Sequence, residues 1–389
     1  MDESRRTTQQ QHDDVLAKMN AGSKKIGELF REGKRDEAEQ IKLETAALKE
    51  TAHQMNQQLS ESEANLKDIL LQIPNAPNPS VPKGREETDN EIVFQVEELP
   101  TLPDGCLAHW DIMKKYNLVD MELGVKITGA GFPVYKGKGA RFQRALINYF
   151  LDQAIDAGYL ELIPPLLVNA ESAYGTGQLP DKEGQMYHAR DDDFYLIPTA
   201  EVPITNVYRD TILEESDFPI KMVGYTPCFR REAGSYGKDV KGLNRVHQFD
   251  KVEIVQIQHP EKSYETLNQM VKHVEGLLNK LGLPYRIAKL CGGDLSFASA
   301  LTFDMEVYSA GQGRWLEVSS ISNFETFQSN RLKLRYKDEN KKKHLAHTLN
   351  GSALALPRIV AALLENNQTE SGVVVPEVLR PYTGFDIIN

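Results

Sequence analysis

The chain has 389 residues, of which 45 are Lys or Arg and 56 are Asp or Glu, so its formal net charge is −11. At about 100–200 residues per domain, this length predicts two or three domains. The acidic balance argues against a protein that coats nucleic acid generally, because affinity for phosphate backbones comes mainly from cations, so a polyanionic partner must meet a local basic patch.

Cysteine usage and hydropathy narrow the class of protein further. Cys106, Cys228 and Cys291 are far apart and odd in number, which fits neither a disulfide framework nor a paired-cysteine zinc site. No apolar run approaches the roughly 18 residues that a membrane span needs. The N-terminal residues lack the apolar core of a secretory signal. We therefore expect a cytoplasmic protein that does not bind a membrane.

The first 73 residues contain no Pro, Trp or Tyr and a single Phe, Phe30. Apolar or small residues recur there at alternating spacings of four and three, the a/d pattern of a heptad repeat: Ile41, Thr45, Leu48, Ala52, Met55, Leu59, Ser62, Leu66, Ile69 and Ile73. A weaker seam runs from Val15 to Leu29, and the polar segment 31–35 between the seams contains Gly33. The pattern predicts an antiparallel helical hairpin over 1–73, with its second helix over 36–73. From spacing alone, a coiled-coil dimerisation stalk and a binding arm are equal alternatives.

Repeated prolines from Pro74 to Pro82 predict that the second helix ends there and that an extended linker over 74–109 follows. From about Trp110 the pattern mixes helices and strands. Helical spacing covers 141–157 and 261–281, whereas 159–163, 251–257 and 302–308 have the character of strands. We predict an α+β domain over 110–389, built on an antiparallel β-sheet with flanking helices.

Several common catalytic signatures do not occur in the sequence. There is no Walker A sequence and no GxGxxG after a strand, so a loop-and-helix phosphate cradle is not predicted. His344 and His347 form one close pair but lack a carboxylate or cysteine at zinc-ligand spacing, which favours a structural or solvated role. A hydrolytic metal centre is therefore not indicated.

A charged hairpin over 228–255 carries the main chemical signal. Two alternating strands flank a loop rich in Gly and charge, and we expect Arg230 and Glu232 on the same face of the first strand, with Arg245 near the start of the second. Arginine presents a fixed fork of donors that suits phosphate oxygens. The alternative is a surface hairpin with salt bridges, each of which contributes little to stability.

This hairpin resembles motif 2 of the class II aminoacyl-tRNA synthetases, and its amino-acid sequence is similar to that of the seryl-tRNA synthetase family of bacterial type. The likeness continues through segments 199–205, 293–294, 317–323, 350–358 and 375–381, and covers nearly the whole chain. Residues 132–164 are similar to motif 1, the dimer-forming element. The resemblance implies a class II catalytic domain over 110–389 preceded by a coiled-coil arm, a homodimer, and a serine–tRNA ligase that uses ATP and L-serine.

The resemblance also assigns residues to ATP. It implies that Arg230 binds the α-phosphate, Glu232 reads the adenine amino group, Phe249 stacks on the ring, and Arg245 and Arg358 hold the β- and γ-phosphates. The full ATP set is Arg230, Arg231, Glu232, Arg245, Phe249, Glu317, Val318, Ser319, Ser320 and Arg358, of which Arg230 and Arg358 count as catalytic. For Phe249 on its own, a core aromatic is the alternative.

Serine and a metal ion are assigned in the same way. Thr199 and Glu201 are implied to hold the ammonium and Glu253 and Ser352 the hydroxyl of serine, with Ala200 in the same segment. Pairing of the hydroxyl would reject alanine, because alanine leaves buried polar groups unpaired. Glu317 and Ser320 look like the family's Mg²⁺ ligands, since Mg²⁺ prefers hard oxygens. A strand-end turn with a Ser cap is the alternative for that pair.

For the arm, the resemblance implies tRNA(Ser), with tRNA(Sec) as a second candidate substrate, bound along the long variable arm by shape. Residues 1–71 carry 11 basic and 14 acidic residues, so contact has to come from clusters such as Lys24-Lys25. Against the family pattern, we expect the first arm helix to start almost at residue 1, without the small lead-in that usually precedes it, and Leu301 stands where many members carry a lysine. The rival hypotheses are a ligase that loads serine onto a carrier protein, whose relatives lack the long arm, and an inactive coiled-coil paralogue.

Overall fold

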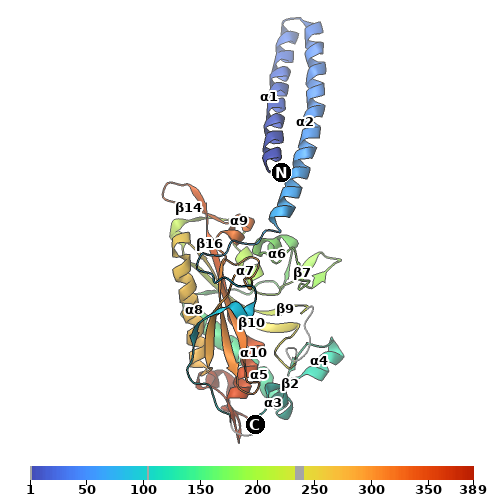
Figure 1. Ribbon diagram of the computed structural model, residues 1–389. Coiled ribbons are helices and arrows are strands. Elements are labelled where there is room, and N and C mark those ends of the chain that lie inside the picture. The colour runs from blue at the N-terminus through green and yellow to red at the C-terminus, as the bar shows by residue number, and fades with distance from the viewer. Residues whose placement is uncertain (1, 103–104, 233–240) are drawn as a thin grey trace. The chain divides into compact units, whose positions relative to one another are not determined.

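The computed structural model describes residues 2–102, 105–232 and 241–389. It divides into two units, Met1–Pro74 and Asn75–Asn389, each of which is considered by itself (Figure 1). Within the described ranges, none of the helices combines the length and the apolar character that crossing a membrane requires. Cys106, Cys228 and Cys291 are free thiols.

The first unit is a hairpin of two long helices that lie side by side, α1 (Asp2–Arg31) and α2 (Arg35–Leu70) (Figure 1). The turn between them uses Gly33 at φ +78°, a conformation that favours glycine. Ala52 and Leu59 of the predicted seam are buried. A Cβ atom on Gly22 would lie 2.7 Å from the Thr45 hydroxyl, so a glycine in the shorter seam allows the two helices to approach closely.

The expectation that the seam and the second helix reach residue 73 is wrong. Helix α2 ends at Leu70, and Ile69 and Ile73 are exposed. Arg5, in the first turns of α1, lies 3.9 Å from Glu63 of α2. Residues after Leu66 therefore extend past the stretch of α2 that α1 covers, and the apolar pattern there is not used within the hairpin.

The second unit is built on an eight-stranded sheet in the described part of the chain. Its strands, in spatial order, are β1 (Glu91–Gln95), β11 (Tyr285–Lys289), β12 (Leu301–Ser309), β13 (Arg314–Asn323), β16 (His347–Ala355), β10 (Gln248–Gln258), β9 (Ile220–Phe229) and β4 (Leu160–Glu161). All neighbouring pairs are antiparallel except β4 with β9, which is parallel. The predicted α+β class and antiparallel sheet are confirmed.

The remaining elements are short apart from three helices. The helices are α3 (His109–Lys115), α4 (Met121–Ile127), α5 (Gly137–Asp156), α6 (Ala170–Thr176), α7 (Glu201–Asn206), α8 (Ser263–Lys280), α9 (Phe327–Leu332), α10 (Leu356–Asn366) and α11 (Arg380–Thr383). The minor strands are β2 (Val119–Asp120), β3 (Val134–Tyr135), β5 (Leu167–Val168), β6 (His188–Ala189), β7 (Phe194–Leu196), β8 (Ile212–Glu214), β14 (Arg335–Lys337), β15 (Lys343–Leu345), β17 (Gln368–Thr369), β18 (Gly372–Val374) and β19 (Ile387–Ile388). They pair in small sheets beside the main one.

The main core covers one face of the large sheet. Helices α5, α8 and α10 share a single buried apolar cluster with Val252 and Ile254 of β10. Successive side chains of a strand point to opposite faces. Lys251 and Glu253, which alternate with that pair, therefore lie on the face that the three helices leave open, and this is where the site forms.

Three expectations about local structure need correction. Strand β9 ends at Phe229 and β10 begins at Gln248, so Arg230, Glu232 and Arg245 lie in the connection and not on the strands. Glu232 has φ +48°, which no extended strand residue adopts. The range 74–109, expected as a linker, contains β1, which pairs with β11 through a run of β-favouring residues. The strand expected over 159–163 shortens to β4, since Pro164 and Pro165 follow closely.

Candidate functional site

A cavity of about 640 Å³ opens on the face of the sheet that carries Lys251 and Glu253. It is lined by all but two of the residues that the resemblance singled out: Thr199, Glu201, Arg230, Glu232, Arg245, Phe249, Glu253, Glu317, Val318, Ser319, Ser320, Ser352 and Arg358. Ala200 is instead buried in a small apolar cluster. The Arg231 side chain is exposed, and its backbone N–H donates to the Gln185 carbonyl at 2.8 Å.

Arg230 lies directly after β9 and is held by neighbours that carry no charge. Its backbone N–H donates to the His247 carbonyl at 2.9 Å, and its Nε donates to the Pro198 carbonyl at 3.4 Å. Its guanidinium carbon lies 5.4 Å from the centre of the Phe249 ring, which is cation–π distance. Phe249 is half-buried at the cavity wall and belongs to none of the buried clusters in the described chain.

Two further arginines border the same cavity. Arg245 Nη1 lies 3.2 Å from Glu232 Oε2. Arg358, near the start of α10, donates from Nε to the Asn244 carbonyl at 2.9 Å and from Nη1 to the Glu317 carbonyl at 2.8 Å. Its Nη1 is also 3.5 Å from Glu317 Oε2. Both guanidinium groups are thus oriented by the protein before any ligand is considered.

Glu317 and Ser320 reach the same cavity because β13 contains a bulge. In a regular strand, residues three apart point to opposite faces. Met305 of β12 pairs with Ser319, whereas Glu306 pairs with Glu317, so Val318 is an extra residue on β13. Such a bulge shifts the alternation by one position and brings both oxygen-bearing side chains to one face. The spacing of three that suited a Ser-capped turn is here part of a continuous strand.

Asp304 of β12 lies opposite Ser320. Its Oδ1 is buried and has no hydrogen-bond partner among the described residues. Burial, followed by the nearby carboxylate of Glu317, raises the pKa of Asp304 well above its usual range. No group of three or more His, Cys, Asp or Glu side chains in the described chain is arranged to hold a metal ion.

The cavity also contains a buried polar cluster centred on Glu253. Its Oε2 lies 2.5 Å from Lys251 Nζ, and both side chains are almost fully buried. The Thr199 and Ser352 hydroxyls donate to the same oxygen at 3.2 and 3.5 Å. Glu253 and Ser352 face each other across the β10–β16 pair. The ammonium of Lys251 therefore balances the charge of this carboxylate inside the protein.

Glu201 begins α7 and is also buried. Burial, reinforced by the charge of Glu253, raises the pKa of Glu201 to about 7 despite a hydrogen bond from Gln328. Gln328 Nε2 donates to Glu201 Oε1 at 2.6 Å, and the Thr348 hydroxyl donates to Gln328 Oε1 at 2.7 Å. The orientation of Glu201 is thus fixed by α9 and β16.

Sequence reasoning missed three of these residues, namely Lys251, Gln328 and Asp304. Lys251 had a signal, because it alternates with Phe249 and Glu253 along one predicted strand. Gln328 had none, since it meets Glu201 from 127 positions away. His344 and His347 lie apart from the cavity lining and bond to Asp338 and Ser263, at 2.8 Å in each case.

The cavity contains two sets of charged side chains that suit different ligands. Arg230, Arg245 and Arg358 provide fixed cations that suit the oxygens of a polyphosphate, and Phe249 offers an aromatic surface. Glu201 and Glu253, by contrast, suit a small molecule that carries a cation and a hydroxyl group. A cavity of this kind can hold an amino acid beside an activated phosphate and bring the two together.

Comparisons with known proteins agree in both units. Residues 185–367 match the family model for the tRNA synthetase class II core domain (G, H, P, S and T), and residues 1–77 match the seryl-tRNA synthetase N-terminal domain. The chain is 52% identical over 387 residues to the serine–tRNA ligase of Salinibacter ruber, which covers 99% of this chain and 90% of that protein.

Solved structures give the same picture. The fold is similar to a seryl-tRNA synthetase from Pyrococcus horikoshii complexed with ATP, with a TM-score of 0.91 and 32% identity, over 100% of this chain and 91% of that one. It is also similar to the cytoplasmic serine–tRNA ligase of Naegleria fowleri in complex with AMP, with a TM-score of 0.86, 29% identity and the same coverage.

Proposed function

The chain belongs to the seryl-tRNA synthetase family and is a serine–tRNA ligase, and we propose that the cavity described above is where L-serine and ATP form seryl-adenylate. The observation that carries this proposal is that one cavity combines three oriented arginines with two buried glutamates. The relative crystallised with ATP supports nucleotide binding at a site of this fold.

Serine is proposed to bind beside Glu201 and Glu253. Its ammonium would contact Glu201 and the Thr199 hydroxyl, and its hydroxyl group would contact Glu253 and Ser352. Thr199, Ser352 and Lys251 already converge on Glu253 Oε2, so the carboxylate is held in one orientation before serine arrives. Alanine would leave this buried polar cluster without its partner, and such sites reject the analogue that lacks a hydroxyl by about 10⁴-fold.

ATP is proposed to bind beside Arg230, Arg245 and Arg358, with adenine between Phe249 and Glu232. Arg230 would contact the α-phosphate, where negative charge builds as the serine carboxylate attacks and pyrophosphate leaves. A cation that is already oriented stabilises that charge without reorganisation, which is how fixed electrostatic groups lower a barrier. Arg245 and Arg358 would hold the β- and γ-phosphates, with Val318 and Ser319 lining the site and Arg231 contributing from its exposed position after β9.

The protein's oxygen donors fit Mg²⁺ as the companion of ATP. The bulge at Val318 places the Glu317 carboxylate and the Ser320 hydroxyl on one face, and Mg²⁺ usually takes only one or two protein ligands beside phosphates and waters. When bound, the ion would neutralise phosphate charge. Glu317 also lies 3.5 Å from Arg358 Nη1, so the carboxylate can position the arginine and the ion together.

For the second half-reaction we propose that residues 1–73 form an arm that binds tRNA(Ser), and tRNA(Sec) as a second substrate. Residues 74–109 would join the arm to the catalytic domain over 110–389 while adding β1 to its sheet. The match of residues 1–77 to the seryl-tRNA synthetase N-terminal domain supports this division. We further propose a homodimer and a cytoplasmic location, in line with the motif 1 likeness and with a role in translation.

Serine-dependent exchange between ATP and pyrophosphate, followed by transfer of labelled serine to tRNA(Ser), tests the proposal. We expect both activities, with threonine and alanine as matched controls that support little exchange. Exchange without transfer would favour a carrier-protein ligase. A folded chain that supports neither activity would favour an inactive paralogue.

A further inference from the structure

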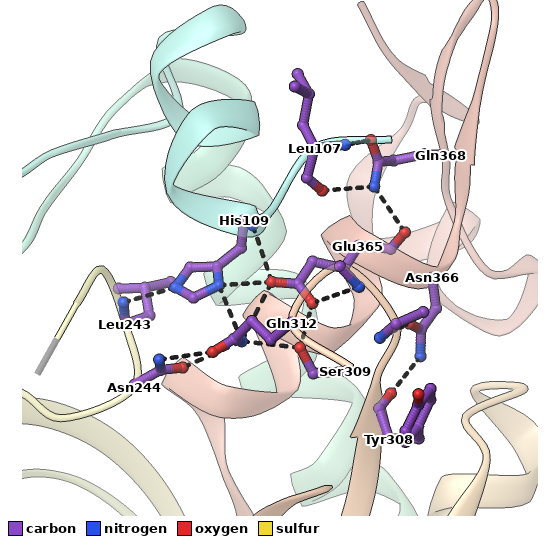
Figure 2. A network of polar contacts seen from close by, with 12 residues as sticks. Leu107, His109, Leu243, Asn244, Tyr308, Ser309, Gln312, Glu365, Asn366 and Gln368 are labelled. Atoms are coloured by element: carbon purple, nitrogen blue, oxygen red, sulfur yellow. Dashed lines mark hydrogen bonds and ion pairs between the residues drawn. The ribbon is translucent and has the colours of Figure 1, made fainter. Parts of the chain in front are cut away.

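A second polar network lies outside the cavity and joins its wall to the interior of the sheet unit. It centres on His109, the first residue of α3, and Glu365 in the last turn of α10 (Figure 2). Both side chains are fully buried. His109 Nδ1 lies 2.8 Å from Glu365 Oε1, and the His109 backbone N–H donates to the same oxygen at 2.9 Å.

The geometry fixes the tautomer of His109. The Leu243 backbone N–H donates to His109 Nε2 at 2.9 Å, so Nε2 must be an acceptor. Nδ1 therefore carries the proton and donates it to Glu365. The ring also lies close against Gly242, where a Cβ atom would come within 2.3 Å of Nε2, and Gly242 has φ +63°.

Glu365 is a rigid anchor for this histidine. Besides His109, the Ser309 hydroxyl donates to Oε2, and Gly311 N and Gln312 Nε2 each donate to the carboxylate at 3.2 Å. Burial alone would raise the pKa of Glu365, but the hydrogen bonds from His109 and Ser309 lower it below its usual range. The carboxylate thus remains ionised in the interior and accepts several hydrogen bonds at once.

The network reaches the proposed ATP site through residues 243 and 244. Asn244 Nδ2 donates to Gln312 Oε1 at 2.8 Å, as Figure 2 shows, and the Asn244 carbonyl accepts from Arg358 Nε at 2.9 Å. Leu243 and Asn244 both line the cavity. Residues 241–247 belong to no helix or strand, so ladder hydrogen bonds do not hold this segment.

We propose that His109 and Gln312 are positioning residues for ATP, which hold Leu243 and Asn244 so that the Asn244 carbonyl aims Arg358 into the cavity. The inference rests on the proposed assignment of Arg358 to the triphosphate. Without the two side chains, the segment could shift while the rest of the sheet stays in place. The proposed serine contacts come from β10, β16, the start of α7 and Thr199 just before it, and none of them from residues 241–247, so we expect the effect to be confined to ATP.

Two substitutions at one position separate this role from a merely structural one. In His109→Gln, the side-chain amide oxygen can take the place of Nε2 and accept from Leu243. In His109→Asn, the amide can take the place of Nδ1 and donate to Glu365, but it is too short to reach Leu243. Both variants lose the ring and are similar in polarity, so a purely structural histidine predicts similar behaviour.

We expect His109→Asn to raise the KM for ATP in the exchange reaction about tenfold, equivalent to about 1.4 kcal/mol, which is the order of one buried neutral hydrogen bond. His109→Gln should stay within about twofold of the wild type, and the KM for serine should change less than about twofold in either variant. Equal ATP effects in the two variants, or an equal effect on serine, would overturn the proposal.

Further variants guard against misfolding. Gln312→Ala keeps His109 and removes the second link to Asn244 together with the Gln312 hydrogen bonds to Glu365 and Ser309. We expect an ATP KM about fivefold higher from the loss of the link to Asn244. If both His109 variants unfold, an unchanged ATP KM in folded Gln312→Ala refutes the inference. Gln368→Ala is the matched control, because Gln368 bonds Leu107 and the Glu365 carbonyl on the far side of the network; it should lower the thermal unfolding temperature without changing the ATP KM.

Calorimetric titration with ATP alone compares the two His109 variants by their affinity for ATP, independently of catalysis. The dissociation constants should follow the same order, with His109→Asn weaker than His109→Gln. A wild type that binds ATP but shows no serine-dependent exchange would contradict the proposed function. The order of the ATP dissociation constants in the two His109 variants would still test the positioning role of the network.

Discussion

Replacing Glu201 with glutamine should stabilise the protein at alkaline pH while it damages serine activation. Glu201 is buried, and burial together with the charge of Glu253 raises its pKa from an ordinary 4.5 to about 7. Between these two pH values the folded chain keeps a proton that the unfolded chain has lost. The free energy of unfolding therefore falls as pH rises through this window. Above pH 7, the stabilisation that came from the proton held on Glu201 in the folded chain is fully lost.

The magnitude follows from the two pKa values. Each tenfold change in proton affinity corresponds to about 1.4 kcal/mol, so the whole displacement amounts to about 3 kcal/mol. At pH 5 only a small part of this destabilisation has developed, and by pH 8 nearly all of it has. The difference in unfolding free energy between Glu201→Gln and the wild type should therefore grow by about 2.5 kcal/mol from pH 5 to pH 8, in favour of the variant.

Urea unfolding at closely spaced pH values measures this difference. Other groups titrate in both proteins, so their contributions cancel in the difference. Glu161→Gln, on an exposed strand residue, is the matched control for the amide replacement itself. A Glu201→Gln difference that stays constant across this range would refute the raised pKa.

The same variant tests the role of Glu201 toward serine. Loss of a charge-assisted hydrogen bond to an ammonium removes about 1.5–3 kcal/mol, so the KM for serine should rise about 10–100-fold while ATP binding is kept. In the wild type, serine binding should strengthen as pH rises towards and through 7, because the ionised carboxylate is the form that binds an ammonium. An unchanged serine KM in the variant would remove Glu201 from the proposed subsite.

Three further predictions follow from the site and the arm. Glu253→Ala leaves the Lys251 ammonium buried without its carboxylate, so serine-dependent exchange should fall more than about 100-fold while the ATP dissociation constant changes little; near-normal exchange would contradict the assignment. Ser320→Ala should raise the Mg²⁺ concentration for half-maximal exchange severalfold, and an unchanged requirement would count against the proposed ligand. Removal of Met1–Pro74, which is a separate unit, should spare exchange and abolish transfer to tRNA(Ser), whereas retained transfer would refute the arm's role.

The parts of the fold that the sequence predicted well are those set by local pattern. The heptad spacing predicted the hairpin of α1 and α2, and alternation predicted β10 and β12 to within a few residues. The same reasoning failed at the C-terminal end of α2, beyond the stretch that α1 covers. The apolar spacing continues to Ile73, but α2 ends at Leu70, because a pattern records what a helix can bury and not what lies against it.

The site was harder to predict from the sequence, because its geometry depends on which strands and side chains lie next to each other in the fold. Glu317 and Ser320 share a face only because β12 imposes a bulge at Val318, and no property of residues 317–320 alone reveals that shift. The same limit applies to His109 and Glu365, which meet across 256 positions. Resemblance to a family gave a list of residues, whereas the contacts that orient them came from the structure.

The charges of the site differ in how the protein balances them, and this bears on their roles. Arg230 is oriented by the Pro198 carbonyl and the Phe249 ring, neither of which carries a charge that would cancel its own. Glu253, by contrast, is balanced by Lys251 at 2.5 Å, so its carboxylate can orient a hydroxyl but attracts a cation weakly. The pKa of Glu201 is instead raised to about 7, first by burial and then by the charge of Glu253. In the proposed complex, the ammonium of serine would therefore be attracted mainly by Glu201 in its ionised form. On the proposed assignment, the stability that this buried carboxyl removes as pH rises through 7 follows from holding a carboxylate there for the ammonium of the substrate.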